Sequence, residues 1–217
     1  MGATETTPDG RSSRWDEHRL ARRQELVEAT LRAIREHGAG VGMDEVAATA
    51  RTSKTVFYRH FTDRAGLYTA VAERVDATII RDLTRAAGDP STDDARAVIR
   101  GVIAAYLRLV ADDPEVYRFI VNAPIVPAGE RPQGDVAAGM TDRIATHVAD
   151  LVAGGLAEAS APRLWGVALV GMVRATADAW LAAGGAASGP SSDELADDLT
   201  ALVWDGLSSV AVPASGG

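Results

Sequence analysis

The chain has 217 residues, of which 47% are hydrophobic, and a formal net charge of −8 at pH 7, so it is not basic over its whole surface. Its length suits one ordinary domain, or a small domain joined to a larger one. The absence of cysteine excludes disulfides, thiolate metal sites and thiol redox sensing, and the polar first 20 residues lack the apolar region of a secretion signal, so we expect a cytoplasmic protein.

Apolar residues recur at helical spacing through the N-terminal third, after a polar and turn-rich segment over residues 1–14 that we expect to be a disordered arm. The first helix should end at Gly38, because glycine commonly terminates helices. The four helices predicted here are Glu17–His37, Met43–Ala50, Lys54–His60, and one that begins near Asp63 and ends before Gly88.

The remaining sequence predicts five more helices, separated by proline-rich and glycine-rich segments. Residues 124–134 carry three prolines and two glycines and predict a loop, and Pro162 suits the first turn of a long helix. Residues 184–192 predict a flexible link. The five helices are Asp93–Ala111, one from Pro114 to before Pro124, Asp135–Ala159, Pro162–Ala183 and Asp193–Val210.

No stretch alternates with a period of two, so we predict an all-α protein of about nine helices. The longest apolar run, Leu164–Val173, is too short to cross a bilayer and is typical of a buried helix. We therefore expect no membrane contact.

Charge is distributed unevenly along the chain. Residues 11–64 hold 11 Arg or Lys against 8 Asp or Glu, whereas residues 65–217 hold 11 arginines against 20 acids. The only lysine, Lys54, lies at the start of the third predicted helix. A mildly basic head on an acidic body favours a nucleic-acid contact confined to one end of the molecule.

Residues 43–61 predict a helix-turn-helix, in which two helices joined by a tight turn place the second helix in the DNA major groove. Val46, Ala47 and Ala50 should face inward from the first of these helices. Val56, Phe57 and Phe61 should anchor the second helix to the same core. This leaves the polar side chains of the second helix for an outer face, with Lys54 and Thr55 in the first turn, where side chains reach base edges.

Further residues around the motif suit contacts with the phosphate backbone. Ser53 is a good N-cap for the second helix, and Thr62 can cap the next one, whose N-terminal amides with Arg64 would favour a phosphate. The candidate DNA-binding residues are Gly42, Arg51, Thr52, Ser53, Lys54, Thr55, Tyr58, Arg59, His60 and Arg64. The alternative is a polar surface on an ordinary helical hairpin.

The segment Ser53-Lys54-Thr55-Val56-Phe57-Tyr58-Arg59-His60-Phe61, followed by Asp63-Arg64 and Leu67-Tyr68, resembles the signature of the TetR family of bacterial transcriptional regulators. In that family a pattern like Ala-Gly-Val-Ser-Lys-x-x-Leu-Tyr-x-His-Phe-x-x-Lys ends the DNA-binding domain. The resemblance implies a helix-turn-helix domain over residues 15–62 and a ligand-binding and dimerisation domain over residues 63–212.

Two positions depart from the family pattern. The glycine of the turn is Arg51 here, and a left-handed conformation at that residue would cost about 1 kcal/mol. The turn is therefore altered, or Arg51 gains a phosphate contact. Gly42 replaces a Thr or Ser at the start of the first motif helix, which removes a hydroxyl that could touch DNA.

Five arginines precede or open the first predicted helix. They could follow a phosphate backbone or enter a minor groove, or they could belong to a solvated tail and an exposed helix face. These residues are Arg11, Arg14, Arg19, Arg22 and Arg23.

The last two predicted helices carry wide apolar stripes, which must pack against the chain's own core or against a second copy as a four-helix bundle. The resemblance favours a homodimer on a palindromic operator. Arg174 and Asp178 are spaced to form a mutual ion pair, which could border the dimer interface or hold a polar group of a ligand. The candidate interface residues are Trp165, Leu169, Arg174, Thr176, Trp180, Leu195, Leu199, Leu202 and Leu207.

The resemblance also implies a ligand pocket among the C-terminal helices. The candidate lining residues, for which ordinary core packing is the alternative, are Tyr106, Tyr117, Phe119, Asn122, Met140, Arg143, His147, Trp165 and Met172. The apolar content of these helices favours a largely hydrophobic small-molecule effector. No cofactor or metal site is expected.

These observations favour a ligand-responsive repressor that leaves its operator when a small molecule binds. A ligand-independent regulator controlled by a protein partner is the alternative. An enzyme is not expected, because the four histidines are dispersed and the sequence contains neither a glycine-rich phosphate loop nor a nucleophile elbow.

Overall fold

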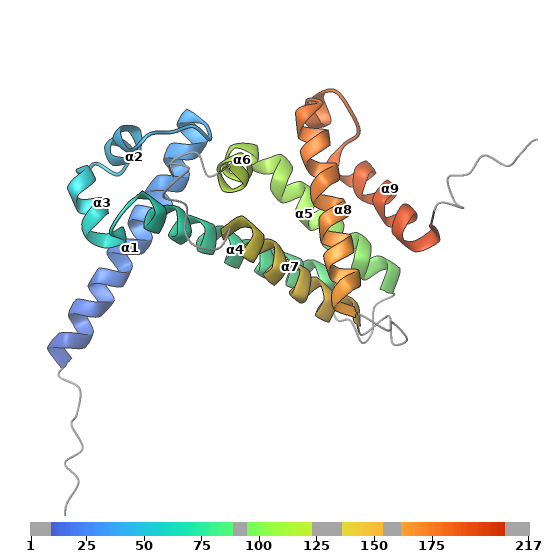
Figure 1. Ribbon diagram of the computed structural model, residues 1–217, viewed down its shortest axis with the longest axis horizontal. Coiled ribbons are helices and arrows are strands. Elements are labelled where there is room, and N and C mark those ends of the chain that lie inside the picture. Colours follow the sequence, from blue (N-terminus) through green and yellow to red (C-terminus); the bar gives the residue numbers. More distant parts are fainter. Residues whose placement is uncertain (1–9, 89–94, 123–135, 154–161, 207–217) are drawn as a thin grey trace, which may run out of the picture.

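The computed structural model describes residues 10–88, 95–122, 136–153 and 162–206, and this described part contains nine α-helices, one 3-10 turn and no strand (Figure 1). The all-α prediction is confirmed. The elements are α1 Gly10–His37, α2 Met43–Thr49, α3 Lys54–Phe61, α4 Arg64–Ala87, α5 Ala95–Asp112, α6 Pro114–Asn122, α7 Val136–Ala153, α8 Pro162–Ala182, the 3-10 turn Gly185–Ala187 and α9 Ser192–Asp205.

Helices α1, α2 and α3 gather at one end of the molecule, around the beginning of α4 (Figure 1). Ile34, Val46 and Phe57 are almost completely buried there, and the Phe57 and Phe61 rings lie 6.1 Å apart. Of the inward-facing residues expected from the sequence, Val46, Ala47, Phe57 and Phe61 are buried in the core of this end, and Ala50 and Val56 pack half-buried against it. Burying them fixes the direction in which the polar side of α3 points.

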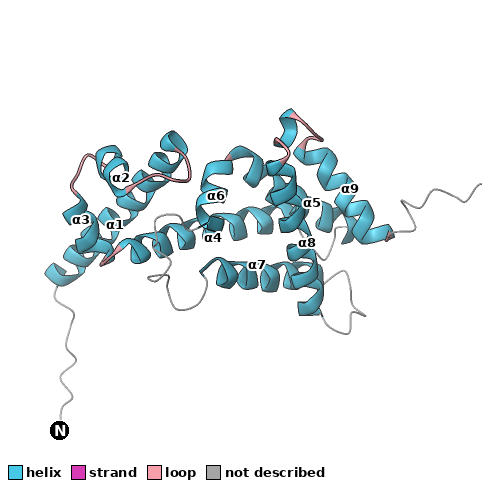
Figure 2. Ribbon diagram, turned by 45° about the horizontal axis from the view of Figure 1, so that its top comes forward, coloured by secondary structure: helices cyan, strands magenta, loops and turns pink. Residues whose placement is uncertain are grey.

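Helix α4 runs from this end into the larger C-terminal half, where it packs against α5 and α7, and α8 covers α7 (Figure 2). One continuous hydrophobic core joins the two halves. Helix α9 packs on α5, and their exposed sides are joined by three ion pairs: Arg96–Asp205 at 3.5 Å, Arg100–Asp197 at 2.5 Å and Arg108–Asp193 at 2.9 Å.

Helix α8 is apolar around much of its circumference, but the residues that the structure describes cover only one side of it. Val173 and Ala177 are buried, whereas Leu164 and Trp165 are 68% and 60% exposed. The prediction of a buried helix is thus correct for one face only. By length and composition alone, residues 164–182 would also suffice to span a bilayer. A helix that packs against another helix passes the same test, so this composition does not indicate a membrane span.

Several predicted boundaries differ from the observed ones. Helix α1 begins at Gly10 rather than Glu17, because no proline or glycine interrupts residues 11–37 and an established helix extends easily. Helix α9 ends before Gly206, which has a φ of 69°, rather than at Val210. Residues 1–9 of the expected arm, the expected loop over 124–134 and the predicted interface residue Leu207 lie outside the described residues.

Candidate DNA interface and ligand cavity

Helix α3 separates a buried apolar side from an exposed polar side. Phe57 and Phe61 are 1% and 4% exposed, whereas Ser53, Lys54, Thr55, Tyr58 and Arg59 are exposed. Arg64, at the start of α4, is also exposed, while Thr52 and His60 are half-buried. The structure therefore places most of the residues predicted for DNA contact on the exposed side of α3 or at the ends that flank it, whereas Gly42 lies at the start of α2.

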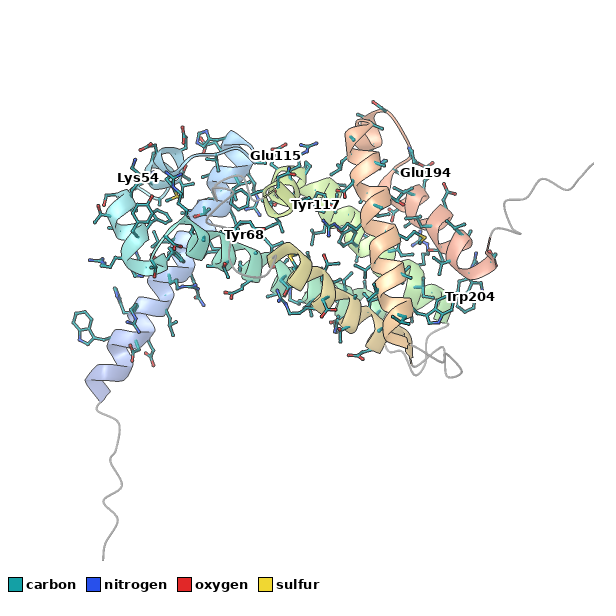
Figure 3. All side chains as sticks on the ribbon, in the orientation of Figure 1. Lys54, Tyr68, Glu115, Tyr117, Glu194 and Trp204 are labelled. Carbon is teal, nitrogen blue, oxygen red and sulfur yellow. The ribbon has the colours of Figure 1, made fainter. Side chains whose placement is uncertain are left out.

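Lys54 makes an ion pair with Asp44 of α2, with 2.8 Å between the ammonium nitrogen and the carboxylate oxygen (Figure 3). Hydrogen bonding to Asp44 raises the pKa of Lys54, so the ammonium group stays charged. Both side chains are largely exposed. Because Asp44 projects from the same end of the motif, an approaching phosphate must compete with this carboxylate for Lys54.

Replacing Asp44 with asparagine is therefore expected to strengthen DNA binding several-fold. The substitution keeps the size of the side chain and removes a negative charge beside Lys54. The gain should be largest at low salt, because exposed charges are screened as salt rises. Fluorescence anisotropy with one duplex over a salt series measures the effect, and Glu73→Gln on α4 is the control. Unchanged affinity at low salt would show that Lys54 does not contact DNA.

The turn between α2 and α3 holds Arg51 at a φ of 50°, in the left-handed region. The backbone amides of Arg51 and Thr52 donate to the carbonyls of Ala48 and Ala47, at 2.9 and 3.0 Å. The turn thus keeps the conformation that glycine favours, although the residue is arginine. Of the two alternatives left by the sequence, an altered turn is ruled out and a phosphate contact by Arg51 remains a prediction.

Two substitutions separate the strain at Arg51 from a contact with DNA. Arg51→Gly should raise the free energy of unfolding by roughly 0.5–1 kcal/mol in urea, because glycine adopts positive φ without steric cost. Arg51→Ala removes the side chain but keeps the strain, so stability should not rise. If Arg51 contacts a phosphate, both variants should reduce the slope of log affinity against log salt by about 0.9. Equal stability of the glycine variant and the wild type would contradict the claim that the positive φ of Arg51 costs stability.

The caps of α3 and α4 differ in detail from the prediction. Ser53 occupies the N-cap position of α3, but its side chain makes no capping hydrogen bond. Asp63, not Thr62, caps α4, and its carboxylate accepts a hydrogen bond from the Gly66 amide at 2.7 Å. Thr62 has a φ of 68° and is instead the C-cap residue of α3.

His60 lies on the side of α3 that faces α1. Burial, Arg59 and the α1 residues Arg19, Arg22 and Arg23 all lower its pKa, so the imidazole is neutral at neutral pH and can still donate one N–H. The Arg23 guanidinium lies 5.0 Å from the centre of the Phe61 ring. Arg19 and Arg22 pair with Asp16 and Glu25 within α1. Arg19, Arg22 and Arg23 are thus held on a helix beside α3, and Arg11 and Arg14 belong to the same helix, which begins at Gly10.

The C-terminal half contains a cavity of about 210 Å³. Its wall is mostly apolar, with residues from α1, α4, α6 and α7: Leu31, Val75, Ile79, Val116, Ile120 and Met140. The cavity therefore reaches from the ligand-binding half to α1, which carries part of the core of the DNA-binding end.

Three of the predicted ligand residues line this cavity: Tyr106, Tyr117 and Met140. The Tyr117 hydroxyl donates to the Asp178 carboxylate at 2.6 Å (Figure 3). Burial raises the pKa of Tyr106 and of Tyr117, so both hydroxyls stay protonated. These hydroxyls are the polar groups that a ligand would meet on the α5 and α6 sides of the cavity.

The other predicted ligand residues lie elsewhere. Phe119 is fully buried with its ring 5.9 Å from that of Tyr68, Asn122 and Trp165 are exposed, and Met172 is half-buried outside this cavity. Arg143 donates to Asp76, a buried carboxylate, at 2.6 Å, and half-buried His147 lies 2.7 Å from the Thr84 hydroxyl. The cavity is also lined by charged residues that the sequence pattern did not indicate: Glu28 and Arg35 on α1, and Arg74 and Arg81 on α4.

The candidate interface residues also fall into two groups. Trp165 is exposed, and Leu169, Thr176, Leu195 and Leu202 are half-buried. Trp180 and Leu199 are covered by the chain itself, and the Trp180 indole donates to the Pro190 carbonyl at 2.9 Å. The predicted ion pair between Arg174 and Asp178 is wrong, because each side chain turns to a different neighbour: Arg174 donates to Thr141, and Asp178 accepts from Tyr117.

Two families match this chain in consecutive segments. The family described as "Bacterial regulatory proteins, tetR family" matches residues 26–71, and "Tetracyclin repressor-like, C-terminal domain" matches residues 82–216. An uncharacterized HTH-type transcriptional regulator of Mycobacterium tuberculosis is 37% identical over 92% of this chain and 82% of its own length. The HTH-type transcriptional activator FasR of Mycolicibacterium smegmatis is 30% identical over 87% of this chain and 84% of its own.

Solved structures share the fold. A TetR-like transcriptional regulator from Rhodococcus sp. RHA1 has a TM-score of 0.60 and 25% identity, covering 85% of this chain and 94% of its own. FadR from Bacillus subtilis has a TM-score of 0.64 and 14% identity, covering 84% of this chain and 98% of its own. The likeness extends over both halves of the molecule.

Proposed function

The chain belongs to the TetR family of bacterial transcriptional regulators, and from that premise we propose that it is a cytoplasmic, dimeric repressor that a small, largely hydrophobic ligand releases from a palindromic operator. Membership of the family makes the protein a DNA-binding regulator and not an enzyme. The dimer, the direction of regulation and the ligand are parts of the proposal.

The polar side of α3 carries the proposal for DNA binding. The buried Phe57 and Phe61 anchor one side of α3 in the core, so Lys54, Thr55 and Tyr58 project together from its exposed side. A helix held in this way can enter the major groove with its first turn against base edges. Arg59, Arg64 and the arginines of α1 can then contact phosphates on either side.

The exposed apolar face of α8 supports the proposed dimer. Leu164, Trp165 and Val167 are largely exposed, although the same helix is buried on its other side. Pairing α8 with its copy would cover this face, as in a helix bundle. A symmetric dimer would place two α3 helices on half-sites about 34–36 Å apart, or a multiple of that distance.

The position of the cavity supports control by a ligand. Two ion pairs tie α1 to the helices around the cavity, Arg35–Asp113 at 2.7 Å and Arg74–Glu28 at 2.7 Å, and all four residues line it. The Tyr68 hydroxyl of α4 also donates to the Ile120 carbonyl of α6 at 2.6 Å (Figure 3). A ligand that favours another arrangement of α1, α4 and α6 would therefore shift the population away from the DNA-binding state.

The names of the relatives give only partial information on whether the protein represses or activates and on which ligand it binds. FasR is named an activator, whereas occlusion of the operator by the bound dimer would repress. FadR from Bacillus subtilis was solved in complex with stearoyl-CoA, but at 14% identity its likeness shows the fold alone. The ligand class of this chain must therefore be argued from its own cavity.

A reporter assay tests the proposed direction. The operator bound by the purified protein is placed upstream of a reporter gene, with and without expression of the regulator. We expect lower expression with the wild type, and a return to the basal level when Lys54 and Tyr58 are both replaced by alanine. A rise in expression with the wild type, absent with the variant, would mean activation and would overturn the proposed repression.

A further inference from the structure

The charged residues around the cavity carry an inference about the ligand. Although the chain has a net charge of −8, the described residues that line the cavity include four arginines and only two carboxylates, Glu28 and Asp113. The lining is thus net positive in an acidic protein. Such a local excess of positive charge favours an anionic ligand.

Three of the four arginines already have carboxylate partners. Arg35 pairs with Asp113, Arg74 pairs with Glu28, and Arg81 pairs with Asp82 at 3.2 Å. These three ion pairs neutralise the charges of Arg35, Arg74 and Arg81. The fourth arginine of the cavity is not neutralised by any of these pairs.

Arg174 on α8 is the exception among the four arginines of the cavity. Its guanidinium donates to the Thr141 hydroxyl of α7 at 3.1 Å, and it makes no ion pair with any residue that the structure describes. The nearest acid on α8, Asp178, is engaged by the Tyr117 hydroxyl. A half-buried cation beside apolar side chains is costly unless a counter-charge reaches it, and a guanidinium is shaped to bind a carboxylate through two parallel hydrogen bonds.

We propose that the cavity binds a small organic anion with a compact apolar body and one carboxylate, and that Arg174 pairs with this carboxylate. The inference rests on the proposed ligand control and names the class of ligand. A dry cavity of about 150 Å³ holds a benzene molecule, so about 210 Å³ suits an apolar body of roughly eight carbon atoms. Ile79, Met140 and Ile144 would contact that body, and Tyr106 and Tyr117 would border the head group.

Calorimetric titration of the full-length protein with octanoate and with 1-octanol tests this inference. The two compounds share the length of the chain and differ in charge. Octanoate should bind at least about tenfold more tightly than 1-octanol, as expected for a charge-assisted hydrogen bond in a partly buried site. In Arg174→Met this preference should disappear while 1-octanol binding persists, because methionine keeps the apolar stem.

Two further variants make the result specific to Arg174. Arg81→Met removes another arginine of the same cavity, but one already paired with Asp82, so the preference for octanoate should remain. Arg174→Lys should restore part of the preference, because it keeps the charge. Thermal melting of each variant without ligand shows whether it is folded, and the lysine variant provides the test if the methionine variant does not fold.

The outcomes separate this inference from the proposed function. Equal affinity for the two compounds, no binding of either, or a preference that survives in Arg174→Met would overturn the inference, whatever the protein does on DNA. Operator binding is measured on the same samples. If octanoate binds through Arg174 but leaves the operator affinity unchanged, the assignment of Arg174 stands and the proposed release of DNA fails for this ligand class.

Discussion

Replacing Trp165 with glutamate is expected to convert the proposed dimer into a monomer, with a loss of roughly 100-fold or more in self-association, as for a central tryptophan of an interface. The side chain is 60% exposed in the single chain and lies on the apolar face of α8. Two copies related by a two-fold axis would bring two buried carboxylates close together, and neither would have a partner.

Sedimentation equilibrium of wild type and variant over a range of concentrations measures this effect. Trp15→Glu is the matched control, because Trp15 is also an exposed tryptophan, at 76%, but belongs to α1, which lies far from α8 (Figure 1). The control should remain dimeric. A dimeric Trp165→Glu variant would show that this face of α8 is not the interface. Operator affinity should fall when dimerisation is lost, since each monomer reads only one half-site.

Phe119→Ala is expected to lower the free energy of unfolding by about 3–5 kcal/mol, the usual cost of removing a buried aromatic ring. Phe119 has no exposed surface, and its ring packs against Tyr68, whose hydroxyl joins α4 to α6. The sequence left open whether this residue contacts a ligand or belongs to the core. Full burial outside the cavity favours the core.

Urea unfolding monitored by circular dichroism measures the loss, and Phe119→Leu is the control. Leucine should cost clearly less than alanine, because it fills most of the space. A loss below about 1 kcal/mol for the alanine variant would be typical of a surface position and would contradict the core assignment. Unchanged stability together with altered ligand affinity would instead favour direct contact with a ligand.

The sequence predicted the positions of the helices well because it encodes them locally. Apolar residues at helical spacing, with Gly38, Pro114 and Pro162 at helix ends, are enough to place most elements within a few residues. The same periodicity indicated that Phe57 and Phe61 are buried, and therefore which side of α3 is free for DNA. The exposed side of the motif was thus predictable in most of its residues.

The partners of charged side chains were not predictable, because they depend on how separate helices pack. Arg174 and Asp178 have the spacing of an ion pair, yet α7 and α6 offer each of them a closer partner. Asp44 and Lys54 meet because the turn at Arg51 folds α2 against α3. The cavity residues on α1, such as Arg35, reach it through the tertiary contacts of α1 with α4 and α6.

The most direct test of the central claim is selection of genomic DNA fragments from the source organism by the purified protein. It is carried out over a salt titration beside the Lys54→Ala, Tyr58→Ala double variant, whose folding is checked by thermal melting. We expect the wild type to retain a palindromic site at salt concentrations that abolish nonspecific binding, and the double variant to lose it. Uniform weak retention that vanishes with modest salt, equal in the two proteins, would contradict the assignment of α3 as the helix that reads DNA.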